Sequence, residues 1–159
     1  MPQAEVSIAT ASSAADLAAA RTLFLAYADS LGFDLGFQDF ETELADLPGK
    51  YAPPSGSLLL ARVDGEAAGV VALRDLGDGF CEMKRLYVRP EARGHGLGRR
   101  LVEQLIREAR QRCYRAMRLD TVPTHHDNAI AVYRRFGFRE IPAYCHNPMP
   151  GTLFMELPL

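Results

Sequence analysis

The sequence predicts a protein of the α/β class, more narrowly α+β, whose mixed and mostly antiparallel sheet has about six or seven strands and about four flanking helices. Two strand-like segments joined by Asp64-Gly65 indicate an antiparallel hairpin, and a later succession of strand, helix and strand indicates a crossover between parallel strands. The 159 residues, 48% of them hydrophobic, suffice for one core. We therefore expect residues 1–159 to form a single domain.

The N-terminal part is predicted to hold one strand and two helices. A weak alternation marks a short strand at Glu5–Ala9, and Ser13-Ala-Ala-Asp16 has the form of a capping box that opens a helix. Apolar residues at helical spacing continue to about Leu31, where Gly32 is a natural stop. A shorter helical spacing follows over 40–47.

The central hairpin is predicted from Ser57–Val63 and Glu66–Arg74, because the intervening Asp64-Gly65 favours a type I′ turn. The next strand, Phe80–Arg89, contains the adjacent cations Lys84-Arg85, which break its alternation as happens at a bulge or beside a ligand cleft. The remaining elements are a helix over Leu97–Arg112, a strand over Ala116–Thr121, a helix over Asn128–Phe136, and strands over Phe138–Ile141 and Thr152–Leu157.

Charge and cysteine content exclude several classes of partner. The 18 basic and 20 acidic residues give a formal net charge of −2, without the broad positive field that non-specific nucleic-acid binding needs. No apolar run reaches the ~20 residues of a membrane span, and the N-terminus lacks the features of a signal peptide. Cys81, Cys113 and Cys145 are odd in number and far apart, which indicates neither a disulfide framework nor a zinc site. We expect a cytoplasmic protein with no nucleic-acid or membrane partner.

The most specific feature is the turn Arg93-Gly94-His95-Gly96-Leu97-Gly98, between a strand and an amphipathic helix. Without Cβ atoms its backbone can curl so that successive N–H groups point inward, and the first turn of the helix adds free donors. Such a turn suits a pyrophosphate, although the glycines alone are about equally compatible with a connection that binds nothing. A Walker loop is excluded because no G-K-[ST] follows, and the dinucleotide fingerprint fails because Arg99 occupies its last position.

The chain resembles the GNAT N-acetyltransferases over most of its length. The family's [QR]-x-x-G-x-[GA] turn corresponds to Arg93-x-x-Gly96-x-Gly98, and Asn128 and the later AVYRRFGF fall in the family's order. The resemblance implies direct transfer of an acetyl group from acetyl-CoA to an amine, without a covalent enzyme intermediate. It also implies that the strand, the turn and a later helix contact the coenzyme, through Leu86, Tyr87, Val88, Arg93, Gly94, His95, Gly96, Leu97, Gly98, Arg99 and Asn128.

Acetyl transfer to an amine needs two proton transfers, and the resemblance offers one residue for each. Glu82, eleven residues before Arg93, corresponds to a base that draws a proton from the amine through water. The alternative is a surface glutamate on a partly solvated strand. Tyr133, four residues before Gly137, corresponds to a tyrosine whose hydroxyl protonates the coenzyme thiolate. Tyr133 also lies on an apolar stripe, so a packed core tyrosine is its alternative, and the two roles are compatible.

The acceptor is predicted to be a small-molecule amine or an exposed peptide amine. The segment 141–157 resembles the tail of a subset of bacterial members. Candidates for an acceptor pocket are Tyr27, Phe33, Tyr144 and Asn147, although packing or turn chemistry also explains each of them. The cluster His125-His126-Asp127 has no third ligand at suitable spacing, so we expect no metal.

Two other functions are compatible with the turn: a catalytically silent acyl-CoA sensor on the same fold, and a nucleotide-binding module. The presence of both Glu82 and Tyr133 favours the enzyme. The sequence leaves the identity of the acceptor and the oligomeric state open, a homodimer included.

Overall fold

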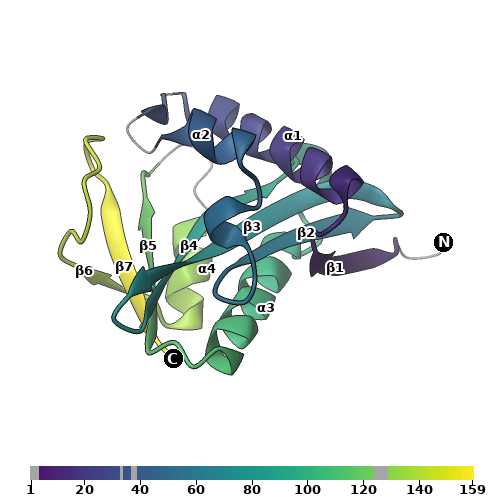
Figure 1. The fold of residues 1–159 in the computed structure, drawn as a ribbon. Helices are drawn as coiled ribbons and strands as arrows, with labels where there is room; N and C mark the ends of the chain where they lie inside the picture. Colours follow the sequence, from purple (N-terminus) through teal and green to yellow (C-terminus); the bar gives the residue numbers. More distant parts are fainter. Residues whose placement is uncertain (1–3, 33, 37–38, 124–128) are drawn as a thin grey trace.

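The computed structural model describes residues 4–32, 34–36, 39–123 and 129–159, and its elements follow the predicted order (Figure 1). Within these residues, seven strands form a sheet in the order β1-β2-β3-β4-β5-β7-β6. The strands are β1 (Val6–Thr10), β2 (Ser57–Val63), β3 (Glu66–Gly77), β4 (Phe80–Val88), β5 (Ala116–Thr121), β6 (Arg139–Ile141) and β7 (Leu153–Pro158). The helices are α1 (Ala14–Leu31), α2 (Phe40–Ala45), α3 (Leu97–Gln111) and α4 (Ala129–Phe136), with short 3-10 helices η2 (Gly49–Tyr51) and η3 (Pro90–Ala92). The predicted α+β class is confirmed.

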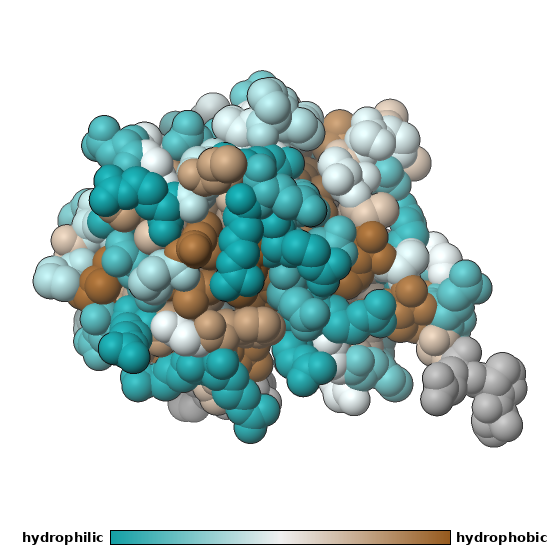
Figure 2. Space-filling model, turned by 90° about the horizontal axis from the view of Figure 1, so that it is seen from below, coloured by the Kyte–Doolittle hydropathy of each residue, from teal (hydrophilic) through white to brown (hydrophobic). Residues whose placement is uncertain are grey.

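The two faces of the sheet are covered by different helices (Figure 1). On the face of α1 and α2, Phe24 and Tyr51 are fully buried and their rings meet edge to face. On the face of α3 and α4, Leu101 and Leu105 of α3 pack with Met117 of β5. Seen from below, the surface is mostly hydrophilic, with small hydrophobic patches between the polar side chains (Figure 2). Within the described ranges, no helix is long and apolar enough to cross a membrane.

Local signals in the sequence produce the ends of the first helix and the central hairpin as predicted. The Ser13 hydroxyl accepts a hydrogen bond from the Asp16 N–H at 3.0 Å, and the Asp16 carboxylate accepts one from the Ser13 N–H, which completes the capping box. Asp64 and Gly65 both have positive φ (51° and 83°), as a type I′ turn requires.

Several element ends differ from the prediction by one to three residues, and three of these differences have a clear cause. The strand expected to end at Arg74 continues to Gly77, because β3 keeps pairing with β4 beyond that point. The next strand stops at Val88 rather than Arg89, since Pro90 opens η3. The helix expected over 40–47 ends at Ala45, two residues before the Leu47-Pro48 bond.

A bulge and a gap interrupt the sheet at the carboxyl end of β4. Val70 of β3 pairs with Tyr87 and Ala72 pairs with Lys84, so one residue on β3 faces two on β4, and Arg85 takes a left-handed conformation (φ 62°). The predicted break at Lys84-Arg85 is therefore confirmed as a bulge. Parallel pairing of β4 with β5 covers only Phe80–Glu82 against Ala116–Arg118. The carboxyl ends of the two strands diverge beyond these residues, at the edge where open α/β sheets bind ligands.

Candidate active site

The glycine turn lies where β4 leads through η3 into α3. Gly94 and Gly96 have φ of 89° and 71°, and an added Cβ at either would meet no atom within 4 Å. The turn is exposed to solvent apart from Gly98, which is half-buried, and Leu97, whose side chain is buried in the core. Leu97 can therefore contact a ligand only through its backbone. The Arg93 side chain donates to the Val88 carbonyl at 3.0 Å and lies over the Tyr87 ring, which ties the turn to the end of β4.

The start of α3 suits an anion. Its N-cap is Gly96, which offers no side-chain hydrogen bond to the first turn, in contrast to the capped start of α1. The first helical bond that closes on Gly96 comes from Arg100, so the N–H groups of Leu97, Gly98 and Arg99 precede the hydrogen-bonded ladder. The first turn carries no acidic residue, and the Arg99 side chain is exposed. These features fit a pyrophosphate at the predicted turn.

The three residues predicted to offer backbone groups to a pantetheine chain lie on the diverging part of β4. Leu86 and Val88 pack against the core on the α3 side, whereas Tyr87 packs on the α1 side. Their side chains thus hold the strand in place from both faces. The β5 ladder has ended by this point, which leaves this edge of β4 facing the gap.

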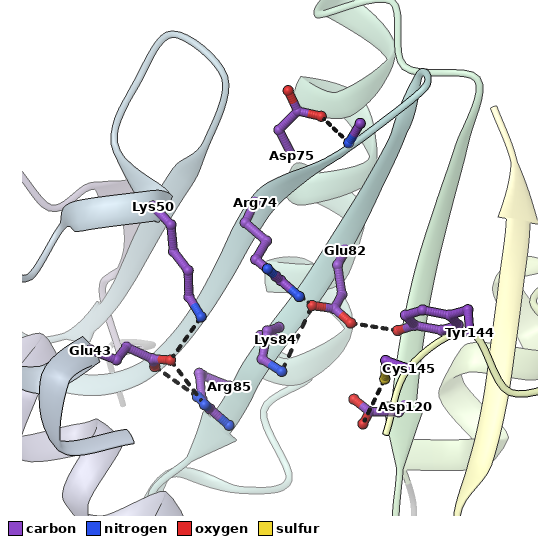
Figure 3. A network of polar contacts seen from close by, with 11 residues as sticks. Glu43, Lys50, Arg74, Asp75, Glu82, Lys84, Arg85, Asp120, Tyr144 and Cys145 are labelled. Atoms are coloured by element: carbon purple, nitrogen blue, oxygen red, sulfur yellow. Dashed lines mark hydrogen bonds and ion pairs between the residues drawn. The ribbon is translucent and has the colours of Figure 1, made fainter. Parts of the chain in front are cut away.

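Glu82 is fully buried at the start of the gap, so the alternative of a surface glutamate is wrong. Its Oε1 accepts a hydrogen bond from Arg74 Nε at 2.7 Å and lies 3.7 Å from Lys84 Nζ (Figure 3). Its Oε2 accepts a hydrogen bond from the Tyr144 hydroxyl at 2.6 Å. The strand pairing explains part of this cluster, because Arg74 lies directly opposite Glu82 on β3.

The cluster alters the protonation of its members. Burial raises the pKa of Glu82, but the charges of Lys84 and Arg74 and the hydrogen bond from Tyr144 outweigh burial, and the pKa lies below its ordinary value of 4.5. Burial lowers the pKa of Lys84 more than Glu82 raises it. Burial, followed by the Glu82 charge, raises the pKa of the Tyr144 phenol well above its ordinary value. At neutral pH, Glu82 is therefore an ionised carboxylate that accepts a hydrogen bond from a neutral Tyr144 hydroxyl.

The predicted acceptor residues divide into two groups. Tyr144 joins Glu82, and Tyr27 of α1 lies edge to face with Tyr87 and under the Arg85 guanidinium, so both border the gap from the α1 face. Asn147 instead donates to Asp120 at 3.0 Å and accepts from the Met149 N–H at 3.0 Å, which is turn chemistry. Phe33, Asn128 and the cluster 125–127 lie outside the described residues.

Tyr133 lies on the opposite face of the sheet from Glu82. It belongs to the core cluster on the α3 side, is 6% exposed, and its ring centroid is 5.8 Å from that of Phe138. The packed ring that was one alternative is thus present. The two predicted catalytic residues therefore belong to opposite faces of the sheet.

A second buried ion pair adjoins the site and was not predicted. Arg85, from the bulge, donates to both oxygens of Glu43 on α2 at 2.8 and 3.0 Å, and its guanidinium lies over the rings of Phe40 and Tyr27. Lys50 approaches the same carboxylate at 3.4 Å. The adjacent cations in a strand were the only signal of this pair in the sequence. Glu43 carried none, since its partner is 42 residues away.

Comparisons with known proteins agree with this geometry. The model of the acetyltransferase (GNAT) family matches residues 19–138. An uncharacterized N-acetyltransferase of Schizosaccharomyces pombe is 42% identical over 159 residues, which cover 99% of this chain and 97% of the relative. A solved structure from Klebsiella pneumoniae, assigned as an acyl-CoA N-acyltransferase, has 32% identity and a TM-score of 0.69, with 98% of this chain and 97% of that chain covered. A GNAT-family acetyltransferase of Staphylococcus aureus has a similar fold, with a TM-score of 0.78 at 17% identity over 96% of this chain and 98% of that chain.

Proposed function

The chain belongs to the acetyltransferase (GNAT) family, and we propose that it transfers an acetyl group from acetyl-CoA directly to an amine of a small molecule or to an exposed peptide amine. One observation carries the proposal. The gap between β4 and β5 has an uncapped, glycine-rich helix start at one end and a buried, hydrogen-bonded Glu82–Tyr144 pair beside it. The first feature suits a phosphate-bearing coenzyme, and the second suits proton transfer from an amine.

The coenzyme-binding half of the site uses backbone more than side chains. The N–H groups at the start of α3 would bind the pyrophosphate, with Arg93 and Arg99 beside them, and the free edge of Leu86–Val88 would hold the pantetheine arm and orient the thioester carbonyl. Bound there, acetyl-CoA supplies an activated acyl group.

The acceptor amine must lose a proton to become a nucleophile or as it attacks. We assign this step to the Glu82–Tyr144 pair. The Tyr144 hydroxyl accepts the proton from the amine while it donates its own to Glu82 Oε2, 2.6 Å away. Tyr144 thereby takes the place of the relaying water expected from the sequence. On the other face, Tyr133 would donate a proton to the departing thiolate.

The thiols near the sheet support direct transfer rather than a covalent enzyme intermediate. Burial raises the pKa of Cys81 to about 12, and burial with the nearby Asp120 charge raises the pKa of Cys145 to about 11. The thiolate is the nucleophilic form, so neither residue is activated for acyl transfer.

Release of free thiol from acetyl-CoA, measured with a panel of amines, tests this function. We expect Glu82→Gln to lower kcat/KM by ~10²-fold, as is usual for loss of a general base, and Tyr144→Phe to act in the same direction. Glu66→Gln, a change of the same type at an exposed position on β3, serves as the matched control.

Because Glu82→Gln leaves Arg74 and the buried Lys84 without their ion-pair partner, Tyr144→Phe is the cleaner variant of the two. Thermal unfolding shows whether each variant is folded. Unchanged turnover in a folded Tyr144→Phe protein would show that Tyr144 does not relay the proton to Glu82. Unchanged turnover in both variants would show that another group is the base.

A further inference from the structure

The α1 face of the site carries more positive than negative charge. Four cations, Arg74, Lys84, Arg85 and Lys50, share two carboxylates, Glu82 and Glu43. A third carboxylate, that of Asp120 on β5, accepts a hydrogen bond from Asn147. When Asp120 is counted, the four cations still exceed the three carboxylates by one positive charge. The side chains of Glu43, Glu82, Lys84 and Arg85 are each no more than 7% exposed, so water screens these charges weakly.

The excess donors belong to Arg74 and Lys84. Arg85 is closed against Glu43 by two hydrogen bonds and supports the bulge. Arg74, in contrast, bonds Glu82 only through Nε among the described residues, which leaves the two terminal nitrogens of its guanidinium. Lys84 lies 3.7 Å from Glu82 Oε1, longer than a normal N–H···O hydrogen bond.

Arg74 and Lys84 also occupy the right place. They flank Glu82, which is bonded to Tyr144, so their free donors lie beside the residues assigned to receive the proton of the amine (Figure 3). An anionic group bound to them would hold a neighbouring amine close to the Tyr144 hydroxyl.

Accordingly, we propose that the acceptor carries a carboxylate beside its amine, as an amino acid does, and that Arg74 and Lys84 bind this carboxylate. The inference rests on the proposed acyl transfer. The same cations favour the chemistry, because a nearby positive charge lowers the pKa of an ammonium group and so increases the fraction of neutral, nucleophilic amine. A polyamine without an acidic group would instead add charge of the same sign.

Paired acceptors test the proposal: amino acids against the corresponding amino-acid amides, assayed for thiol release from acetyl-CoA at equal concentrations of neutral amine. We expect a preference for the acids of ~10-fold or more in kcat/KM, the range for a hydrogen bond to a charged group. Lys84→Met and Arg74→Gln should each cost ~10-fold more in kcat/KM with the acids than with the amides, chiefly through KM, because only the acids lose a bound carboxylate. Arg62→Gln, which removes an equally half-exposed, ion-paired arginine at the outer end of β2, is the control.

The outcomes separate the inference from the function beneath it. Equal use of acids and amides by the wild type, or equal losses with both in the two variants, would overturn the anionic subsite while acyl transfer stands. Calorimetry with an N-acetyl amino acid and its amide measures the same selectivity without turnover. If the wild type binds the acid more tightly than the amide and Lys84→Met abolishes this difference, the subsite is supported even if no amine releases thiol. A complete lack of thiol release would refute only the proposed transfer.

Discussion

Tyr133 shows how one side chain can serve the core and the chemistry together. Its ring is buried against Phe138, and in the proposed reaction its hydroxyl donates a proton to the leaving thiolate. Tyr133→Phe keeps the ring and removes only the hydroxyl. We expect kcat to fall by roughly ten-fold or more, with nearly unchanged affinity for the coenzyme, as measured by steady-state kinetics and calorimetry.

Tyr114→Phe provides the control for Tyr133→Phe, because it removes a tyrosine hydroxyl that bonds the Ser55 carbonyl outside the site. A Tyr133→Phe protein with the wild-type kcat would leave Tyr133 as a packing residue alone.

The sequence predicted the identity of Glu82 and Tyr144 as site residues, but not that they touch. They are 62 residues apart, and their contact depends on how the segment after β6 returns across the end of β5. The burial of Glu82 could not be predicted either, because an isolated carboxylate in a strand usually faces solvent. The compensating charges come from Lys84 on the same strand and from Arg74, which strand pairing places opposite Glu82.

Among the elements, α3 is the one whose start the proposed function uses most directly. Gly96→Val puts a β-branched residue at φ 71°, a conformation that such residues rarely adopt. Because an added Cβ meets no neighbouring atom, the expected effect comes from the backbone: the turn shifts, its N–H groups turn away, and affinity for coenzyme A falls by at least ~10-fold.

A matched control exists in the hairpin turn. Gly65→Val places the same residue at φ 83°, also with no atom within 4 Å of the new Cβ, at the far end of β2 and β3. It should cost similar stability and leave coenzyme binding unchanged in calorimetry. Equal affinities in both variants would reject the turn as the coenzyme site.

Elements with local signals were predictable, and elements set by distant partners were less so. The capping box, the Asp64-Gly65 turn and the apolar stripe of α3 all lie within a few residues of what they determine. The ion pair between α2 and the β4 bulge joins Glu43 to Arg85, and no spacing rule connects the two. The sequence therefore predicted a break in the strand at Lys84-Arg85, with a bulge as one of its two explanations, but not the contact that α2 makes with it.

For the molecule as a whole, the buried carboxylates should determine acid stability. Burial raises the pKa of Glu43, but Arg85 and Lys50 lower it by more than burial raises it. The pKa values of both Glu43 and Glu82 therefore lie below the ordinary value of 4.5. Groups with a lowered folded pKa stabilise the protein above their unfolded pKa, and this stability is lost as the pH falls through the folded pKa. We expect a nearly constant Tm from pH 7 to about 5 and a steep fall below pH 4.5, measured by calorimetry.

Glu43→Gln checks the origin of this fall. At pH 7 it should lower stability by about 3–5 kcal/mol, because Arg85 loses its buried partner, and its Tm should depend less steeply on pH below 4.5. Glu140→Gln, at an exposed position on β6, should reproduce the wild-type curve. Parallel curves for Glu43→Gln and the wild type would assign the acid sensitivity to other groups.

The two halves of the site differ in how the chain supplies them. Everything proposed to bind the coenzyme among the described residues, apart from Tyr133, lies on one continuous stretch from β4 through η3 to the start of α3. The acceptor half combines Glu82 and Lys84 of β4 with residues from separate places: Arg74 on β3 and Tyr144 after β6, with Glu43 and Lys50 beside them. Mutations in these separate segments can therefore alter the acceptor half without touching the coenzyme half. Acceptor specificity can therefore change between related proteins while the coenzyme-binding half of the site stays the same.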